Sequence, residues 1–131
     1  MIQSVHHIGC LVSDMNEAVA DYLALYPQGE VSELFDITDQ KVFVKFIKIA
    51  GLHIELVQPA SEDSSLFRQL KKKPGFYHIG IFTDDIDSEI DRLEKEGYRK
   101  LNKFSSPAFN GRHCAFLYNL EEHLIELIEN G

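Results

Sequence analysis

His7-Ile8-Gly9 occurs again as His78-Ile79-Gly80, and Ile54-Glu55-Leu56 occurs again as Ile125-Glu126-Leu127, both after the same displacement along the chain. That displacement places a histidine and a glutamate of the first half on a histidine and a glutamate of the second half. The sequence separation from histidine to glutamate is therefore identical in the two halves. This match predicts a duplicated unit that carries one histidine and one glutamate in each copy.

The repeated glutamates lie inside runs that are typical of buried strands. Residues 52–57 and 124–128 are rich in leucine and β-branched side chains. A carboxylate in such a run must be paired, hydrogen-bonded or bound to a metal, because its burial alone is costly. Strand alternation turns Glu55 away from its two apolar neighbours and places His7 on the same face as Gly9. The sequence therefore predicts two repeats that face each other across one metal site with four ligands, His7, Glu55, His78 and Glu126.

Both halves show the order strand, helix, three strands, which predicts an α+β fold. In the first half Asp14 is the expected N-cap of the helix, and Pro27 and Gly29 are its expected end. In the second half Asp85 and Gly97 have these roles. The expected strands are residues 5–12, 30–36, 41–49 and 52–58 in the first half, and 77–83, 98–104, 112–118 and 122–129 in the second.

The chain is interpreted as one domain, residues 1–131, made of two modules. Module one covers about residues 1–58, and module two about residues 76–131. The connector, residues 59–75, is expected to contain a short helix. The turn-rich stretch 105–111 is a candidate lid or pocket edge.

Composition excludes several classes of function. The net charge of −8 argues against nucleic-acid binding, which depends on Lys and Arg. No apolar run approaches the length of a membrane span, and the first residues do not form a signal peptide. Cys10 and Cys114 are expected to be buried thiols, so a reducing cytoplasm is the expected location. The basic patch of Arg68 with Lys71-Lys72-Lys73 is either a solvated loop or a dock for an anionic substrate tail.

These motifs give the chain a resemblance to a known family over nearly its whole length. The His-Ile-Gly and Ile-Glu-Leu segments, with residues 54–59 and 61–75, resemble the vicinal oxygen chelate superfamily in its glyoxalase I and methylmalonyl-CoA epimerase branch. The resemblance implies paired βαβββ modules that form an open, cupped mixed sheet around one divalent ion. It implies a homodimer as well. The ligand positions that match the family are His7, Glu55, His78 and Glu126.

The resemblance also implies a reaction, the removal of a proton next to a carbonyl. Two imidazoles and two carboxylates suit zinc, nickel or cobalt, and a bound ion would stabilise developing negative charge as a Lewis acid. By this resemblance Glu126 is the catalytic base, and Glu55 is its symmetry mate on the other side of the substrate.

Three functions follow from this interpretation. The main hypothesis is a glyoxalase I-like enzyme (lactoylglutathione lyase), which isomerises the hemithioacetal of a thiol and methylglyoxal. The first alternative is an epimerase of the methylmalonyl-CoA type, which acts on a thioester, and the cationic side chains of Lys71, Lys72 and Lys73 would suit its CoA phosphates. The second alternative is a metal-free protein of the bleomycin-resistance type that only binds an antibiotic.

Some further polar residues are candidates for smaller roles. His53 shares a predicted face with Glu55 and could orient a ligand or contact substrate. Arg112 could hold a carboxylate or a phosphate at the mouth of a pocket. Four histidines are left out of the set of metal ligands, namely His6, His53, His113 and His123.

Overall fold

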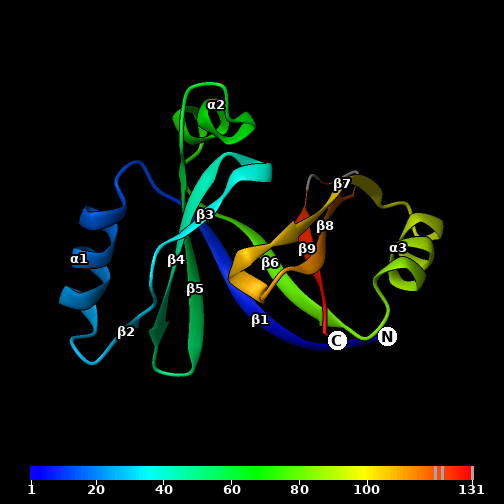
Figure 1. The fold of residues 1–131 in the computed structure, drawn as a ribbon, viewed down its shortest axis with the longest axis horizontal. Coiled ribbons are helices and arrows are strands. Elements are labelled where there is room, and N and C mark those ends of the chain that lie inside the picture. The colour runs from blue at the N-terminus through cyan, green and yellow to red at the C-terminus, as the bar shows by residue number, and fades with distance from the viewer. Residues whose placement is uncertain (120, 122, 131) are drawn as a thin grey trace. The chain divides into compact units, whose positions relative to one another are not determined.

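The computed structural model describes residues 1–119, 121 and 123–130. The chain forms two compact units, which we name by their histidines. The His7 unit is residues 7–77, and the His78 unit is residues 1–6 together with residues 78–131. Figure 1 shows the ribbon of both units, coloured along the chain.

The sheet of the His7 unit is built around two adjacent antiparallel strands, β4 (Val42–Ile49) and β5 (Leu52–Pro59). Strand β1 (Ile2–Leu11) lies parallel to β5 with its residues 7–11. The order in this unit is β2-β4-β5-β1, and β3 also pairs with β4 (Figure 1).

The expected strand at residues 30–36 is two strands in the structure, β2 (Glu30–Val31) and β3 (Phe35–Ile37). Both pair antiparallel with β4. The break follows from Ser32, because its hydroxyl accepts a hydrogen bond from the backbone N–H of Phe46 at 2.8 Å. A serine side chain that binds the backbone in this way takes the place of a regular ladder bond.

Helix α1 (Met15–Leu25) covers one face of this sheet. The carboxylate of Asp14 accepts the backbone N–H of Glu17 at 3.0 Å, so the predicted N-cap is confirmed. The helix ends two residues before Pro27. The buried core between helix and sheet contains Cys10, Met15, Ile47, Ile54 and Leu56.

The connector contains the expected short helix, α2 (Ser65–Lys72). Its N-cap is Ser64, whose hydroxyl accepts the backbone N–H of Leu66 at 3.4 Å. Lys71 and Lys72 lie in its last turn, and Lys73 is its C-cap. All three lysines are exposed. Cations at this end complement the negative end of the helix dipole.

In the His78 unit the strand order is β6-β9-β8-β7. The parallel pair is β6 (Gly75–Thr83) with β9 (Leu124–Glu129), and β8 (Arg112–Tyr118) is antiparallel to both β9 and β7 (Arg99–Ser106). The expected start of the last strand at Glu122 lies outside the described residues.

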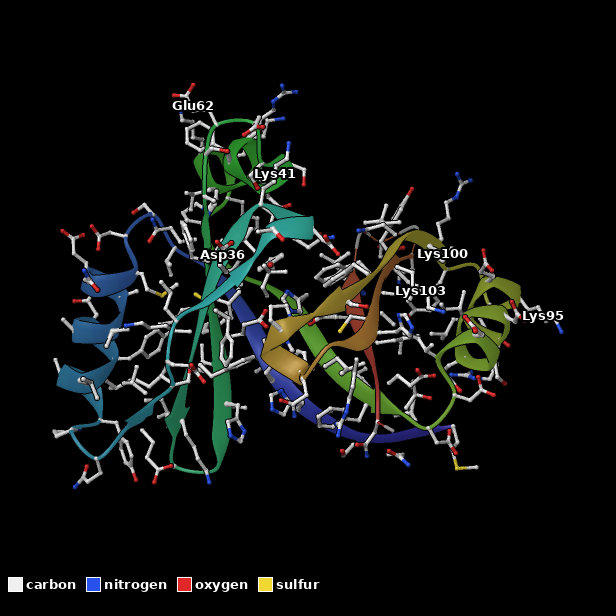
Figure 2. All side chains as sticks on the ribbon, in the orientation of Figure 1. Asp36, Lys41, Glu62, Lys95, Lys100 and Lys103 are labelled. Atoms are coloured by element: carbon white, nitrogen blue, oxygen red, sulfur yellow. The ribbon has the colours of Figure 1, made fainter. Side chains whose placement is uncertain are left out.

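Helix α3 (Ile86–Lys95) packs on the sheet of the His78 unit. Asp85 caps it as predicted, accepting the backbone N–H of Ser88 at 3.1 Å. Figure 2 shows Lys95 on α3, and Lys100 and Lys103 on β7. Lysines along β7 oppose edge-to-edge association of this outer strand. The core beneath the helix contains Ile86, Ile90, Leu93, Ala115, Leu117 and Leu127.

The first six residues belong to the His78 unit because side chains at the end of β6 and near the end of the chain bind them. The hydroxyl of Thr83 donates to the carbonyl of Met1 at 3.0 Å. The side-chain amide of Asn130 donates to Gln3 at 2.9 Å. The two ends of the described chain therefore lie close together within this unit (Figure 1).

The stretch 105–111, the candidate lid or pocket edge, is an anchored turn. Strand β7 continues to Ser106, which caps the 3₁₀ helix η2 (Pro107–Phe109) by accepting the N–H of Ala108 at 3.2 Å. Phe109 is buried. Asn110 then takes a left-handed conformation with φ of 56°, which asparagine tolerates well. The buried side chain of Phe109 anchors this turn in the core, which argues against a movable lid at residues 105–111.

Candidate functional site

In the His7 unit, a glycine places the imidazole of His7 beside the carboxylate of Glu55. In the parallel register of β1 and β5, Gly9 is the partner of Glu55. His7 comes two residues before Gly9 and shares its face. Since glycine has no side chain, the space next to the carboxylate is left to the imidazole. His7 Nε2 and Glu55 Oε1 are 3.5 Å apart, and both residues are buried.

The His78 unit builds its pair in the same way. Gly80 is the register partner of Glu126 between β6 and β9. His78 comes two residues before Gly80. The separation of His78 Nε2 and Glu126 Oε1 is again 3.5 Å, and both residues are buried. The duplication read from the sequence is therefore a duplication of local geometry.

The donor set of each pair fits a metal. A separation of 3.5 Å is longer than a normal N–H···O hydrogen bond. Two donor atoms about 2.1 Å from a first-row ion, at an angle of about 90–110°, lie about 3.0–3.4 Å apart. The observed spacing is thus close to that of two ligands of one ion. Each pair offers the imidazole nitrogen and carboxylate oxygen that such ions accept.

A third buried carboxylate shows what an ordinary buried acid requires. Glu89 of α3 is buried and pairs with the guanidinium of Arg92 at 2.5 Å. Burial alone would raise the pKa of Glu89, but the hydrogen bond from Arg92 holds that pKa below its usual value. The charged partner that Arg92 provides for Glu89 is replaced at Glu55 and Glu126 by an imidazole. An imidazole can bind a metal cation as well as donate a proton.

Sequence comparison of the halves missed one aromatic residue beside each pair. Phe46 lies opposite Glu55 in the β4–β5 register, and Phe116 lies opposite Glu126 in the β8–β9 register. The displacement that aligns the ligands places Phe46 on Leu117. Phe46 and Phe116 are separated by one residue fewer than the aligned ligands, so the two phenylalanines fall out of alignment in the sequence repeat.

The other candidate histidines have separate places. His53 is half-buried and is the register partner of His7 between β1 and β5, so it stays a candidate for contact with a ligand or substrate. His6 contacts the rings of Phe82 and Phe109 within the His78 unit. His113 and His123 are exposed.

Arg112 has a protein partner. Its guanidinium donates to the side-chain oxygen of Asn130 at 3.3 Å. Asn130 in turn donates to Gln3. In this structure Arg112 therefore helps to join the two ends of the His78 unit, and a carboxylate-binding role for it stays a prediction.

Both cysteines are buried thiols that form no disulfide within the described residues. The hydroxyl of Tyr22 donates to Cys10 Sγ at 3.9 Å. Burial raises the pKa of the Cys10 thiol. Burial and the contact with Cys10 raise the pKa of Tyr22 to about 12. A protonated, buried thiol is unreactive, so Cys10 is a packing residue.

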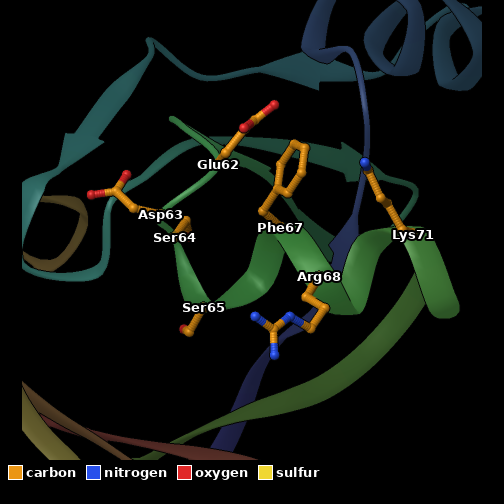
Figure 3. Close-up of a pocket in the computed structure, with 7 residues that line it drawn as sticks. All are labelled: Glu62, Asp63, Ser64, Ser65, Phe67, Arg68 and Lys71. Carbon is orange, nitrogen blue, oxygen red and sulfur yellow. The ribbon is translucent and has the colours of Figure 1, made fainter.

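A recess of 580 Å³ lies at α2. Figure 3 shows its lining side chains. Lys71 Nζ lies 4.7 Å from the centroid of the Phe67 ring, a cation–π contact. Asp63 binds Lys41 at 2.8 Å and also Ser61, and these bonds lower the pKa of Asp63 to about 2. The lining residues are Glu62, Asp63, Ser64, Ser65, Phe67, Arg68 and Lys71.

Among the described helices, none has the length and apolarity needed to cross a membrane.

Comparison with known proteins gives a family and several relatives. The family model described as the glyoxalase/bleomycin resistance protein/dioxygenase superfamily matches residues 6–116. The human mitochondrial methylmalonyl-CoA epimerase is 28% identical over 116 residues, which are 87% of this chain and 65% of that protein. The chain thus spans slightly less than two thirds of the length of this relative. The uncharacterised Bacillus subtilis protein YqjC is 29% identical over 131 residues, 94% of this chain and 89% of that one.

Solved structures confirm the α+β fold class. A Streptomyces coelicolor methylmalonyl-CoA epimerase variant, in complex with 2-nitronate-propionyl-CoA, matches with a TM-score of 0.86. The identity is 26%, and the match covers 100% of this chain and 96% of that one. These similarities favour the epimerase alternative over the glyoxalase I hypothesis.

Proposed function

We propose an acyl-CoA epimerase function for this chain, which belongs to the glyoxalase/bleomycin resistance protein/dioxygenase superfamily. The substrate would be a CoA thioester with a carboxylate on the neighbouring carbon, of the methylmalonyl-CoA type. The reaction would remove the proton from that carbon and return a proton to the opposite face. The observation that carries the proposal is the duplicated pair of buried imidazole and carboxylate, in a chain whose relatives include several methylmalonyl-CoA epimerases.

The proposal includes one divalent ion, zinc, nickel or cobalt, with the four ligands that the sequence repeat predicts. When bound, the ion would supply Lewis-acid stabilisation for negative charge that develops on the substrate oxygens. The ligands would be His7, Glu55, His78 and Glu126.

Within this site the two carboxylates would have the proton-transfer roles. Glu126 would take the proton from the carbon between the two carbonyl groups, and Glu55 would serve the opposite face. Both side chains are buried, so bulk water would compete little for the proton. Two chemically equal groups in matched surroundings suit a reaction that must run in both directions.

The proposal also includes a homodimer in the cytoplasm. The side chains of Val5 and Ile79, both in the His78 unit, are apolar and exposed by 61% and 43%. Exposed apolar side chains of this kind suit a subunit interface.

The first test measures exchange of the C2 hydrogen of methylmalonyl-CoA in D₂O by NMR, with protein loaded with zinc, nickel or cobalt. We expect exchange and inversion with at least one ion, and loss of both after chelation and dialysis. Readdition of the ion should restore them, because the ligands would be intact.

The control for this test is the double variant His7→Ala/Glu126→Gln, which should lack bound metal by elemental analysis. Turnover of the methylglyoxal–glutathione hemithioacetal, with no exchange of methylmalonyl-CoA, would favour the glyoxalase I hypothesis. Absence of both activities and of metal uptake would leave the antibiotic-binding alternative.

Replacement of Lys71, Lys72 and Lys73 by alanine should raise KM for methylmalonyl-CoA by roughly three- to tenfold and leave kcat nearly unchanged. Exposed charge pairs contribute little individually, so three together give a modest effect. The phosphates of CoA are far from the reacting carbon, so the chemical step would not change. Steady-state kinetics at low and high salt would measure this, and salt should reduce the difference.

A matched control removes the same charge from the other unit. The triple variant of Lys95, Lys100 and Lys103, all on α3 and β7 (Figure 2), should leave KM unchanged. An equal rise in KM for both triple variants would assign the effect to net charge, and the lysines of α2 would then have no specific role.

A further inference from the structure

Each candidate ligand pair has a phenylalanine at the same position of its sheet. The ring centroids of His7 and Phe46 are 5.7 Å apart with an interplanar angle of 66°. Those of His78 and Phe116 are 5.2 Å apart with an angle of 87°. Both contacts are edge-to-face, a favourable arrangement of aromatic rings.

A second phenylalanine supports the first in each unit. Phe35 contacts Phe46 at 6.2 Å, and Phe104 stacks on Phe116 at 5.8 Å. Phe35 pairs with Val44, and Phe104 pairs with Cys114. Each of these partners lies two residues before the phenylalanine that contacts the imidazole. The aromatic support is therefore duplicated in register.

The neighbouring positions on the same strand face have not kept their residue type. Val44 of β4 corresponds to Cys114 of β8, and Val42 corresponds to Arg112. If these strands served packing alone, the phenylalanines could have diverged as these neighbours have. Retention of a ring opposite the candidate glutamate in both units indicates a local requirement, and each of these rings contacts the imidazole of its unit as well as the supporting phenylalanine.

We infer that Phe46 and Phe116 are positioning residues that fix the imidazole planes of His7 and His78. The terminal torsion of histidine is broad and two-fold, so packing must select the orientation that turns Nε2 toward the carboxylate. The edge-to-face contact opposes rotation of the ring out of that plane. This inference rests on the proposed function where metal affinity is concerned, while the orientation itself is independent of any metal.

The first experiment tests orientation in the metal-free protein. Long-range ¹H–¹⁵N NMR of the histidine side chains should show a single set of sharp signals for His7 and His78. In Phe46→Leu the His7 signals should broaden or double, and in Phe116→Leu those of His78 should. Phe46→Tyr keeps the ring and should retain the wild-type pattern.

The matched control is Phe109→Leu. Phe109 is buried and makes an edge contact with His6, which is not a candidate ligand. This variant should lose comparable packing without any change in the signals of His7 and His78. Unchanged signals for His7 in Phe46→Leu and for His78 in Phe116→Leu would overturn the inference.

The second experiment measures cobalt affinity by chelator competition, with the visible absorption spectrum of bound Co²⁺ as a second readout. Phe46→Leu and Phe116→Leu should each weaken binding by roughly two- to tenfold, the size of one aromatic contact. The spectrum should change in intensity, because the ligand geometry relaxes. Phe109→Leu should alter neither quantity.

The outcomes separate this inference from the proposed function. A wild-type protein that binds no metal would contradict the proposed metal site, and the NMR experiment would still decide whether the phenylalanines position the imidazoles. A wild-type protein that binds Co²⁺ with the same affinity and spectrum as both leucine variants would overturn the positioning role alone.

Discussion

Replacement of Glu126 by glutamine is expected to slow exchange of the C2 hydrogen of methylmalonyl-CoA by roughly two to four orders of magnitude, the usual contribution of a general base. Glutamine has almost the same shape as glutamate, so packing around the buried side chain should change little. Its amide cannot accept the proton, however. The measurement is the exchange rate in D₂O with each epimer as substrate, beside metal content and the free energy of unfolding.

Two controls define this result. Glu55→Gln changes the matched position in the His7 unit. It should slow most strongly the reaction of the epimer whose C2 hydrogen faces Glu55, whereas Glu126→Gln should slow most strongly the reaction of the other epimer. Glu94→Gln removes a charge from an exposed residue of α3 and should have no effect. A Glu126→Gln variant that keeps its metal, its fold and full turnover would exclude Glu126 as the base.

The local elements were largely predictable because each depends on a few neighbouring residues. Asp14 and Asp85 cap their helices as their sequence context predicts, since a cap needs only a short acceptor side chain before an amphipathic run. The burial of Glu55 and Glu126 was predictable from the apolar runs around them. The pairing of each with its histidine followed from the repeat.

Features that depend on register were not predictable in the same way. The split of strand 30–36 arises from a hydrogen bond between the hydroxyl of Ser32 and the backbone of β4, a strand that comes later in the chain. The positions of Phe46 and Phe116 became comparable only when the strands were paired. The displacement that aligns the two glutamates places Phe46 on Leu117, one residue beyond Phe116. The sequence repeat therefore does not reveal this match, although Phe46 and Phe116 occupy the same position opposite the glutamate in their sheets.

The choice between glyoxalase I and epimerase could not be made from the ligand residues. Both reactions begin with removal of a proton next to a carbonyl, and either one would use the same candidate imidazoles and carboxylates. Discrimination between thiol carriers would depend on side chains away from the reacting atoms, and we propose Lys71 and the recess that it lines for this role. The glyoxalase I hypothesis is not confirmed, and the similarity of the whole chain to epimerases favours its alternative.

The two repeats also predict matched losses of stability. Leu56 and Leu127 directly follow the two glutamates, point into the two cores, and are fully buried. Leu56→Ala and Leu127→Ala should each lower the free energy of unfolding by about 2–5 kcal/mol, because each leaves a cavity in a packed core. This is a large part of the roughly 5–15 kcal/mol that stabilises a typical domain.

Urea unfolding followed by circular dichroism measures both losses. Leu101→Ala is the control, since Leu101 is 56% exposed and should change the free energy of unfolding by less than about 0.5 kcal/mol. A loss below about 1 kcal/mol for Leu56→Ala or Leu127→Ala would contradict the packing described here. Because each leucine adjoins a candidate ligand on its strand, a destabilised core should also loosen the strand that holds the carboxylate. Metal affinity should therefore fall in both variants and stay unchanged in Leu101→Ala.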